Sequence, residues 1–227
     1  MRYFLILITL CCVIEKANAK IADYIYPYYD QPSYSNYGTV GLIQMPSARL
    51  HQEGTIGFTW THAEPYLRGS VMGNPFDWFE ASYQYTDVNN KLYSESRDFS
   101  GSQSYKDKSF DAKFRIFKET RIVPQVAVGF RDFGGSSLFS SEFIAASKLI
   151  GNVDFTLGLG WGTISNNTIS NPFSKLDSRF SSRVRNAQGD TQGGEINYGT
   201  FFGGEKAGIF GGAEIFLPKL RGARLKI

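Results

Sequence analysis

Residues 124–162 constrain the fold most, because their apolar side chains recur with a strict two-residue period. In segment 153–162 the odd positions hold Val, Phe, Leu, Leu and Trp, and the even positions hold Asp, Thr and glycines. Segment 125–131 likewise sets Val, Val and Phe against Gln, Ala, Gly and Arg. Successive side chains of a β-strand leave opposite faces, so the pattern predicts strands with one apolar face and one small, polar face.

A small and polar opposite face is not an ordinary packed core. The combination is typical of an outer-membrane barrel wall, with lipid on one side and a wet lumen on the other. A soluble antiparallel sheet with one wet face alternates in the same way. Residues 124–162 therefore predict three consecutive strands and leave both environments open.

The N-terminus has the pattern of a secretory signal peptide. Arg2 is followed by the apolar run Phe4–Ile14 and by the small-x-small motif Ala17–Ala19, which predicts a signal peptide over residues 1–19. The apolar run is shorter than the roughly 20 residues that span a bilayer. Both cysteines, Cys11 and Cys12, lie in this segment, so we expect no disulfide in the exported chain. Lipid anchoring on one of them is disfavoured, since a bulky residue precedes each cysteine.

Composition narrows the class of protein. Lys and Arg number 24 against 21 acids, a net charge of +3, so bulk charge does not favour nucleic-acid binding. The mean hydropathy of −0.24 excludes a helical membrane protein, whereas barrel strands are apolar only at alternate positions.

The remaining chain predicts a short lead-in and a long run of strands. Residues 20–53 form an irregular lead-in. Its Tyr- and Pro-rich part, 20–37, either fills a barrel lumen or is a loose linker whose tyrosines pack on the barrel rim, and 38–50 is a turn of helix or an edge strand. Residues 54–227 form the β-barrel segment, a meander of about eight strands. The strands outside 124–162 are expected at 54–62, 66–72, 78–87, 109–117 and 207–217, with a turn at 73–75 and a ninth strand begun at 224–227.

Loop lengths favour the barrel over a sandwich. Both very long loops, 88–108 and 163–205, follow odd-numbered strands, and the connections after even-numbered strands are short. Outer-membrane barrels sort their loops in this way, with short periplasmic turns and long external loops. The expected fold class is therefore all-β, an antiparallel outer-membrane β-barrel that is incomplete at the C-terminus, since a closed barrel leaves no interrupted strand.

Alternation assigns side chains to the two faces. The residues expected to face the lumen are polar: Asp111, Lys113, Arg115, Arg131, Glu142, Lys148 and Asp154. The residues expected to face lipid are apolar: Phe110, Phe114, Val128, Phe130, Phe143, Phe155, Leu157 and Trp161. The polar row predicts either salt bridges that close a narrow interior or a path for a sugar chain, with rim aromatics such as Tyr83, Tyr85, Tyr93 and Tyr105.

Candidate catalytic groups are few. His51 and His62 have no ligand spacing and are expected at the surface or rim rather than on a metal. The carboxylate pairs Asp107/Asp111 and Glu80/Asp87 have the residue types for glycoside cleavage, but such pairs arise by chance in a chain with 21 acids. We therefore predict no catalytic, cofactor-binding or metal-binding residues.

Five segments in collinear order resemble the YjbH family. They are SNYGTVGLIQMPSAR (35–49), PFDWFEASYQYTDV (75–88), QSYKDKSFDAKFRI (103–116), VAVGFRDFGGSSLFSSEFIAASK (126–148) and DFTLGLGWG (154–162). The resemblance covers roughly residues 35–220 and implies an outer-membrane β-barrel linked to exopolysaccharide and capsule production. It implies a longer protein, since family members are much longer, and its usual lipoprotein-type leader differs from the leader here. It carries over no catalytic residue.

These observations predict a non-enzymatic outer-membrane protein that supports exopolysaccharide biosynthesis or secretion. Its expected partners are outer-membrane lipid, exopolysaccharide and other secretion-system proteins, with no nucleic acid and no cofactor. The alternative is a periplasmic or secreted carbohydrate-binding β-sandwich, which would bury the outward aromatics between two sheets. A polysaccharide-modifying enzyme is a third and weaker hypothesis.

Overall fold

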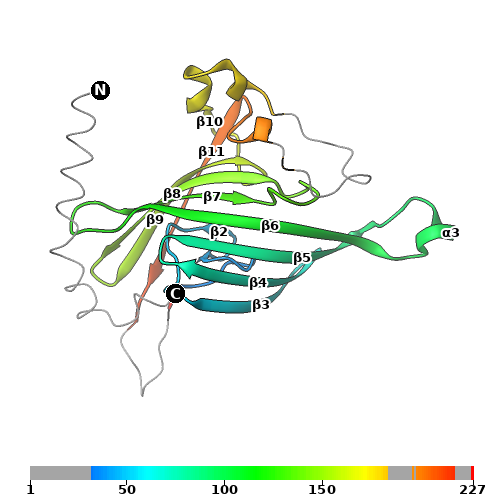
Figure 1. Ribbon diagram of the computed structural model, residues 1–227, viewed down its shortest axis with the longest axis horizontal. Coiled ribbons are helices and arrows are strands. Elements are labelled where there is room, and N and C mark those ends of the chain that lie inside the picture. The colour runs from blue at the N-terminus through cyan, green and yellow to red at the C-terminus, as the bar shows by residue number, and fades with distance from the viewer. Residues whose placement is uncertain (1–31, 184–195, 197, 218–225) are drawn as a thin grey trace.

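The computed structural model describes residues 32–183, 196, 198–217 and 226–227, and its main feature is one curled antiparallel sheet (Figure 1). The nine strands are ordered β10-β11-β9-β8-β7-β6-β5-β4-β3, so consecutive long strands are neighbours. The long strands are β3 (Thr55–Ala63), β4 (Tyr66–Phe76), β5 (Phe79–Leu92), β6 (Ser104–Phe117), β7 (Gln125–Arg131), β8 (Ser141–Ile150), β9 (Val153–Gly162) and β11 (Lys206–Ile215). The expected signal peptide and the lead-in before residue 32 lie outside the described residues.

The remaining elements are short. A two-stranded ribbon pairs β1 (Gly41–Leu42) with β2 (Met45–Pro46), and β10 (Ile169–Ser170) pairs with the start of β11. The helical elements are α3 (Arg97–Ser100), η1 (Pro172–Lys175), η2 (Ser178–Ser181) and η3 (Tyr198–Thr200). Among the described residues, no helix is long and apolar enough to cross a membrane.

Three strands are longer than the sequence predicts. Strand β4 continues through the expected turn at 73–75, and a register shift between Gly73 and Phe76 accommodates Pro75 there. Strands β5 and β6 extend into the expected loop 88–108, so that only residues 93–103, with α3, remain as a connection. These ends carry polar side chains on both faces, which removes the hydrophobic alternation that identifies a strand.

The sheet is open in the part of the chain that the structure describes. No described strand pairs with the outer edge of β3, and β3 does not pair with β11. Beyond β11, Ile215 and Ile227 exchange two backbone hydrogen bonds of 2.7 and 3.1 Å, and Phe216 forms a bridge with Lys226. The all-β antiparallel meander expected from the sequence is therefore confirmed, whereas the sheet of these residues is not closed into a barrel.

Long and short connections lie at opposite ends of the strands. Residues 93–103, 132–140 and 163–205 connect strands at one end, with the short link between β3 and β4. Residues 77–78, 118–124 and 151–152 make the turns at the other end. The hairpin of β5, α3 and β6 projects well beyond the rest of the sheet at the first end (Figure 1).

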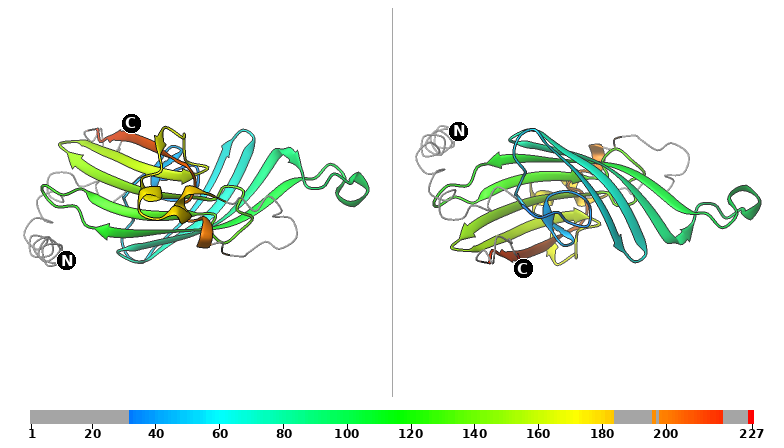
Figure 2. Two further views of the ribbon diagram at one scale, coloured as in Figure 1. Left: turned by 90° about the horizontal axis from the view of Figure 1, so that it is seen from above. Right: turned by 90° about the horizontal axis from the view of Figure 1, so that it is seen from below.

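The N-terminal residues 33–49, here called the inner segment, lie on the concave face of the sheet. Seen from above and below, this blue segment lies between the β3–β5 side and the β8–β11 side of the curled sheet (Figure 2). A small apolar cluster joins the inner segment to the sheet, formed by Ala48 of the segment and by Ala127, Phe143, Ala145 and Phe210 of the strands. Residues 33–37, part of the segment expected either to fill a barrel lumen or to link loosely to the rim, thus lie on the concave face of the sheet.

Phe143 is an exception to the expected faces. Its register partners are Gly129 on β7 and Gly160 on β9, which places its ring on the concave face with 3% of its surface exposed. The prediction that Phe143 lies on the outer face is therefore wrong. The physical reason is local: residues 141–150 have adjacent apolar side chains (Phe143-Ile144, Ala145-Ala146), so their period does not identify a face.

Gly129→Ala is expected to lower the free energy of unfolding by about 1–3 kcal/mol, because overpacking strains a filled core. A Cβ at Gly129 would lie 2.2 Å from the ring of Phe143, which is buried. Gly73→Ala is the matched control, since the nearest atom to its Cβ is the Thr55 carbonyl oxygen at 3.9 Å. Urea unfolding in detergent micelles measures both, and equal stability of the two variants would contradict the packing of Phe143 over Gly129.

Candidate functional site

The inner segment makes a polar contact with each of the eight long strands of the sheet. Its backbone carbonyl and amide groups are bonded to side chains on β3 to β8, and its own side chains reach β9 and β11. The strand residues, from β3 to β11, are Thr61, Ser70, Gln84, Lys113, Gln125, Ser147, Asp154 and Glu214. These seventeen consecutive residues thus contact all eight long strands. Together with the strand residues they contact, they form one band of polar contacts on the concave face, here called the polar strip.

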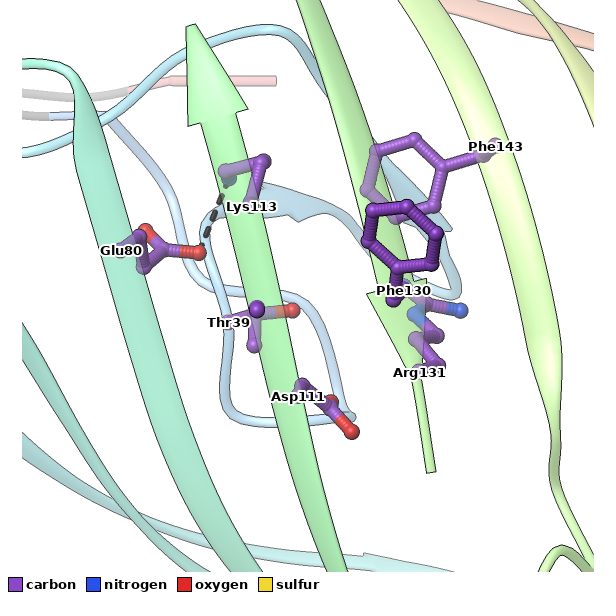
Figure 3. Close-up of a pocket in the computed structure, with 8 residues that line it drawn as sticks. Thr39, Glu80, Asp111, Lys113, Phe130, Arg131 and Phe143 are labelled. Atoms are coloured by element: carbon purple, nitrogen blue, oxygen red, sulfur yellow. Dashed lines mark ion pairs between the residues drawn. The ribbon is translucent and has the colours of Figure 1, made fainter. Parts of the chain in front are cut away.

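The centre of this strip is a buried ion pair on neighbouring strands (Figure 3). Glu80 on β5 and Lys113 on β6 are register partners, and their Oε1 and Nζ atoms lie 2.9 Å apart. Lys113 Nζ also donates to the Val40 carbonyl oxygen (3.0 Å), and the Val40 amide donates to Glu80 Oε1 (3.3 Å). Because both charges are almost fully buried, the backbone of the inner segment supplies hydrogen bonds that water would otherwise provide.

Arg49 forms the second buried charge cluster, at the short-turn end. Its Nε and Nη2 atoms donate to Asp154 on β9 at 2.8 and 2.6 Å, and Nη1 lies 2.7 Å from Glu119 in the β6–β7 turn. Lys148 Nζ also contacts Glu119, at 2.7 Å. The guanidinium group therefore joins β9 to the β6–β7 turn in a fork geometry that suits arginine.

Tyr37 lies between two buried arginines at the other end of the inner segment. The Cζ atoms of Arg68 on β4 and Arg131 on β7 are 4.6 and 4.2 Å from the centre of its ring. Cations over an aromatic face are attracted to its quadrupole, most strongly where water is excluded. The carbonyl oxygen of Tyr37 meanwhile accepts from Gln84 at 2.5 Å. Tyr37 thus links β4, β5 and β7.

The convex face has the opposite chemistry. Between the strand ends it carries aliphatic and aromatic side chains, alanine and glycine, with charged residues only near the ends of strands. Several large side chains are well exposed: Ile56, Phe58, Trp60, Val71, Phe110, Phe155, Leu157 and Ile209. Soluble proteins bury such residues and expose polar ones, so this sheet has its polar face inside and its apolar face outside.

The structure places most of the predicted polar row on the concave face. Asp111, Lys113, Arg131 and Asp154 are buried there, and Arg115 reaches Asp77 in the β4–β5 turn at 2.7 Å. The predicted apolar residues on the convex side are Phe110, Phe114, Val128, Phe130, Phe155 and Leu157, together with Trp161. Their contact with lipid stays a prediction.

Glu142 and Lys148 do not belong to the concave row. Their register partners are Trp161 and Phe155, so both residues lie on the convex side, and the predicted face is wrong for the same reason as for Phe143. Lys148 reaches Glu119 at the edge of the sheet. Glu142 is covered by the connection after β9, where Arg183 Nη1 and Nη2 contact its two oxygens at 2.5 and 2.9 Å.

Trp161 is on the convex side, as predicted, but is fully covered. Its ring stacks on Phe173 at 5.2 Å and meets Phe202 edge-on, and its Nε1 donates to Asn171 Oδ1 at 2.9 Å. Asn171 also donates to the carbonyl oxygens of Phe180, Phe202 and Gly204. The described parts of this connection, residues 163–183 and 198–205, thus pack on the long-loop end of β8 and β9.

The carboxylate pairs considered for glycoside cleavage do not converge. Glu80 is concave and Asp87, seven residues along the same strand, is on the convex side. Asp107 and Asp111 share the concave face of β6, but four residues of strand separate them by roughly 13 Å, and glycosidase pairs are about 5–9.5 Å apart. Neither pair has the geometry of that reaction.

The histidines occupy different environments. His62 is exposed at the end of β3 and lies 2.9 Å from Glu64, whereas His51 is half-buried against Tyr34, with ring centres 4.8 Å apart. Burial and the nearby Lys113 and Lys226 lower the pKa of His51. Among the described residues, no cluster of three or more His, Cys, Asp or Glu side chains is arranged to hold a metal ion.

Asp132, in the connection after β7, is a pH-sensitive group. Burial, together with the charges of Asp107 and Asp111, raises its pKa to about 7, although Oδ2 accepts from the Phe139 amide at 2.8 Å. A carboxyl whose pKa is raised on folding binds protons more tightly in the folded state. We therefore expect stability to fall as pH rises from about 4 to about 7 and to level off above.

Asp132→Asn should flatten this pH dependence and raise stability at neutral pH, since the amide still accepts from Phe139 and carries no charge. Unfolding midpoints in urea between pH 4 and pH 8 measure the effect for both proteins. An unchanged slope in the variant would show that other groups control the pH response.

Arg49, Arg183 and Asn171 organise these clusters, and sequence reasoning did not single them out. All three lie in segments without periodicity, and their partners are distant in sequence, up to 105 residues away for Arg49 and Asp154. The only local signal at Arg49 is a charged residue between Ala48 and Leu50.

Comparisons with known proteins identify the family of the chain. The family model of the "Exopolysaccharide biosynthesis protein YbjH" description matches residues 33–226. The "Uncharacterized lipoprotein YjbH" of Escherichia coli (strain K12) is 41% identical over 194 residues, which cover 85% of this chain and 27% of the relative. The chain thus spans about a quarter of that protein's length. No solved structure matches the chain. The family match covers the inner segment and the sheet together, and the chain belongs to the YjbH family of exopolysaccharide biosynthesis proteins.

Proposed function

We propose that this chain is part of the wall of an outer-membrane β-barrel that supports exopolysaccharide biosynthesis or secretion without catalysing a reaction. The observation that carries the proposal is the uncharged, exposed band on the convex face, set against a buried and charged concave face. Outer-membrane barrels have an outward apolar band about 25 Å tall with a polar interior. A sandwich would cover this band with a second sheet, and no described strand lies over it.

The envelope location has separate support. The relative from Escherichia coli is named a lipoprotein, which is an exported and membrane-anchored class of protein. The expected signal peptide over residues 1–19 also favours export. Long connections at one end and short turns at the other match external loops and periplasmic turns. Further strands, from the part of the longer protein that this chain does not span, would close the barrel.

The inner segment bears on how the protein would act. It fills the concave face from β3 to β11, so this portion of the wall encloses packed protein rather than an open channel. We therefore propose that it acts as a scaffold, and that polymer or partner proteins contact its exposed loops. The absence of a convergent carboxylate pair at 80/87 and 107/111 supports a role without catalysis.

Complementation tests the proposal. Cells that lack the gene should regain extracellular polysaccharide when they carry the full-length protein, and the protein should be in the outer-membrane fraction. Asp111→Asn, at a buried position on the concave face and outside the exposed loops, should leave the polysaccharide yield unchanged. Recovery of the protein in the soluble periplasmic fraction would contradict the membrane wall. A yield abolished by one isosteric carboxamide, with the protein still assembled, would contradict the absence of catalysis.

A further inference from the structure

We propose that a groove along the projecting β5–β6 hairpin binds a saccharide polymer. The proposal rests on the function proposed above and names its ligand class and site. The groove has a volume of about 890 Å³, within the range of about 300–1,000 Å³ that is typical of ligand sites. Its aromatic lining is Tyr83, Tyr85, Tyr93, Phe99, Tyr105 and Phe110.

The groove lies where the uncharged band ends. Tyr83 and Phe110 are register partners on the convex face, and the next pair toward the hairpin tip is Tyr85 with Lys108. The following convex pair is Asp87 with Lys106, which form an ion pair. Charges at this level place the outer part of the groove beyond the hydrocarbon, since a bilayer excludes them.

The lining combines flat rings with hydrogen-bonding groups, which is the chemistry that a pyranose ring requires. Tyr93 and Phe99 are exposed, and their rings are nearly parallel with centres 6.4 Å apart. A tyrosine offers an apolar face to the C–H side of a sugar and a hydroxyl group to its edge. Gln103, Lys108 and Ser136 add donors and acceptors along the groove.

A second observation is an incompletely satisfied polar group in the lining. Asp107 is 1% exposed, and Ser136 donates to its Oδ1, whereas Oδ2 has no hydrogen-bond partner among the described residues. Buried polar atoms are almost always hydrogen-bonded in folded proteins. Asp107 and Ser136 both line the groove, which therefore includes acceptor capacity that the described chain does not use.

The groove's form also suits a polymer. It runs between the hairpin and the connection 132–140, which supplies Gly134, Gly135 and Ser136, and these residues lie at the long-loop end. A lipid acyl chain would need a lining without charge, whereas Lys106, Asp107 and Lys108 line this one. The family's printed description concerns exopolysaccharide, so a saccharide chain is the occupant that these observations favour.

The test uses the full-length protein in detergent and the exopolysaccharide purified from the culture medium of the cells that carry it. Affinity electrophoresis through gels with increasing polymer gives an apparent Kd. Retardation of the wild-type protein is expected, and the double variant Tyr93→Ala/Phe99→Ala should bind roughly tenfold more weakly. Trp78→Ala is the matched control, because it removes a ring that is 46% exposed (Tyr93 is 47% exposed) at the opposite, short-turn end.

Each other outcome overturns the inference. A wild-type protein that is not retarded has no such site, and equal retardation of the double variant places the site elsewhere. If the double variant loses outer-membrane assembly but keeps polymer binding, the rings form an interfacial aromatic belt instead. Outer-membrane fractionation of the same samples separates these results from failure of the membrane-wall proposal, which would remove the wild-type protein from that fraction.

Discussion

Leu157→Arg is expected to destabilise the assembled protein by about 2–4 kcal/mol, because an arginine at the middle of a lipid-facing strand must enter hydrocarbon. Leu157 lies at the centre of β9 on the convex face and is 64% exposed. In water, a charged side chain at so exposed a position would change stability little. The free energy of unfolding of the full-length protein from lipid vesicles in urea measures the difference.

Ile150→Arg is the matched control. Ile150 is 62% exposed and ends β8 beside the short turn to β9, so its side chain lies at the edge of the band. Near an interface, arginine costs only about 0–1 kcal/mol. The two positions are about equally exposed, so a larger loss of stability at the mid-strand position indicates lipid rather than water around the convex face. Similar stabilities of the two variants would show that the convex face does not contact hydrocarbon.

Arg49→Ala is expected to cost about 3–5 kcal/mol, because it leaves the buried carboxylate of Asp154 without its cation. Arg49 holds Asp154 through two hydrogen bonds and contacts Glu119 at 2.7 Å, and it fastens the inner segment to β9. The double variant Arg49→Ala/Asp154→Ala should recover part of this loss, because the unpaired charge on β9 is removed with it. Urea unfolding of the four proteins of this cycle gives the coupling energy.

Arg179→Ala is the control variant, because it removes an arginine that is exposed and not part of a buried ion pair. Its Nε lies 4.0 Å from Asp177, and both side chains are mostly exposed, so the expected change is below about 1 kcal/mol. A loss at position 49 no greater than at position 179 would contradict the role of Arg49 as the anchor of the inner segment.

Periodicity predicted the strands best where one face is apolar throughout. Segments 125–131 and 153–162 alternate at every position, and both are strands in the structure. The hairpin ends of β5 and β6 escaped prediction because both of their faces are polar. Gly73-Asn74-Pro75 has the residues of a turn, but a register shift keeps it within β4. Local sequence does not distinguish a bulge from a turn when the same residues suit both.

Only one of the two sides of the buried polar strip could be predicted from the sequence. Alternation identified one side of it, for example Asp111 and Lys113, because these residues oppose an apolar row. The other side is the inner segment, whose backbone groups supply many of the partners of those side chains. Backbone groups carry no residue-type signal, and the contacts of the inner segment join residues up to 181 positions apart, so this half required the structure.

The most direct test of the membrane-wall proposal attaches a spin label to the introduced thiol of a Leu157→Cys variant of the full-length protein in lipid bilayers. A Glu95→Cys variant, labelled in the same way in the hairpin connection, serves as the aqueous reference. The label on β9 is expected to be accessible to dissolved oxygen and protected from a water-soluble nickel chelate, with the reverse at the hairpin. Equal accessibility of both labels to the nickel chelate would contradict a convex face in lipid.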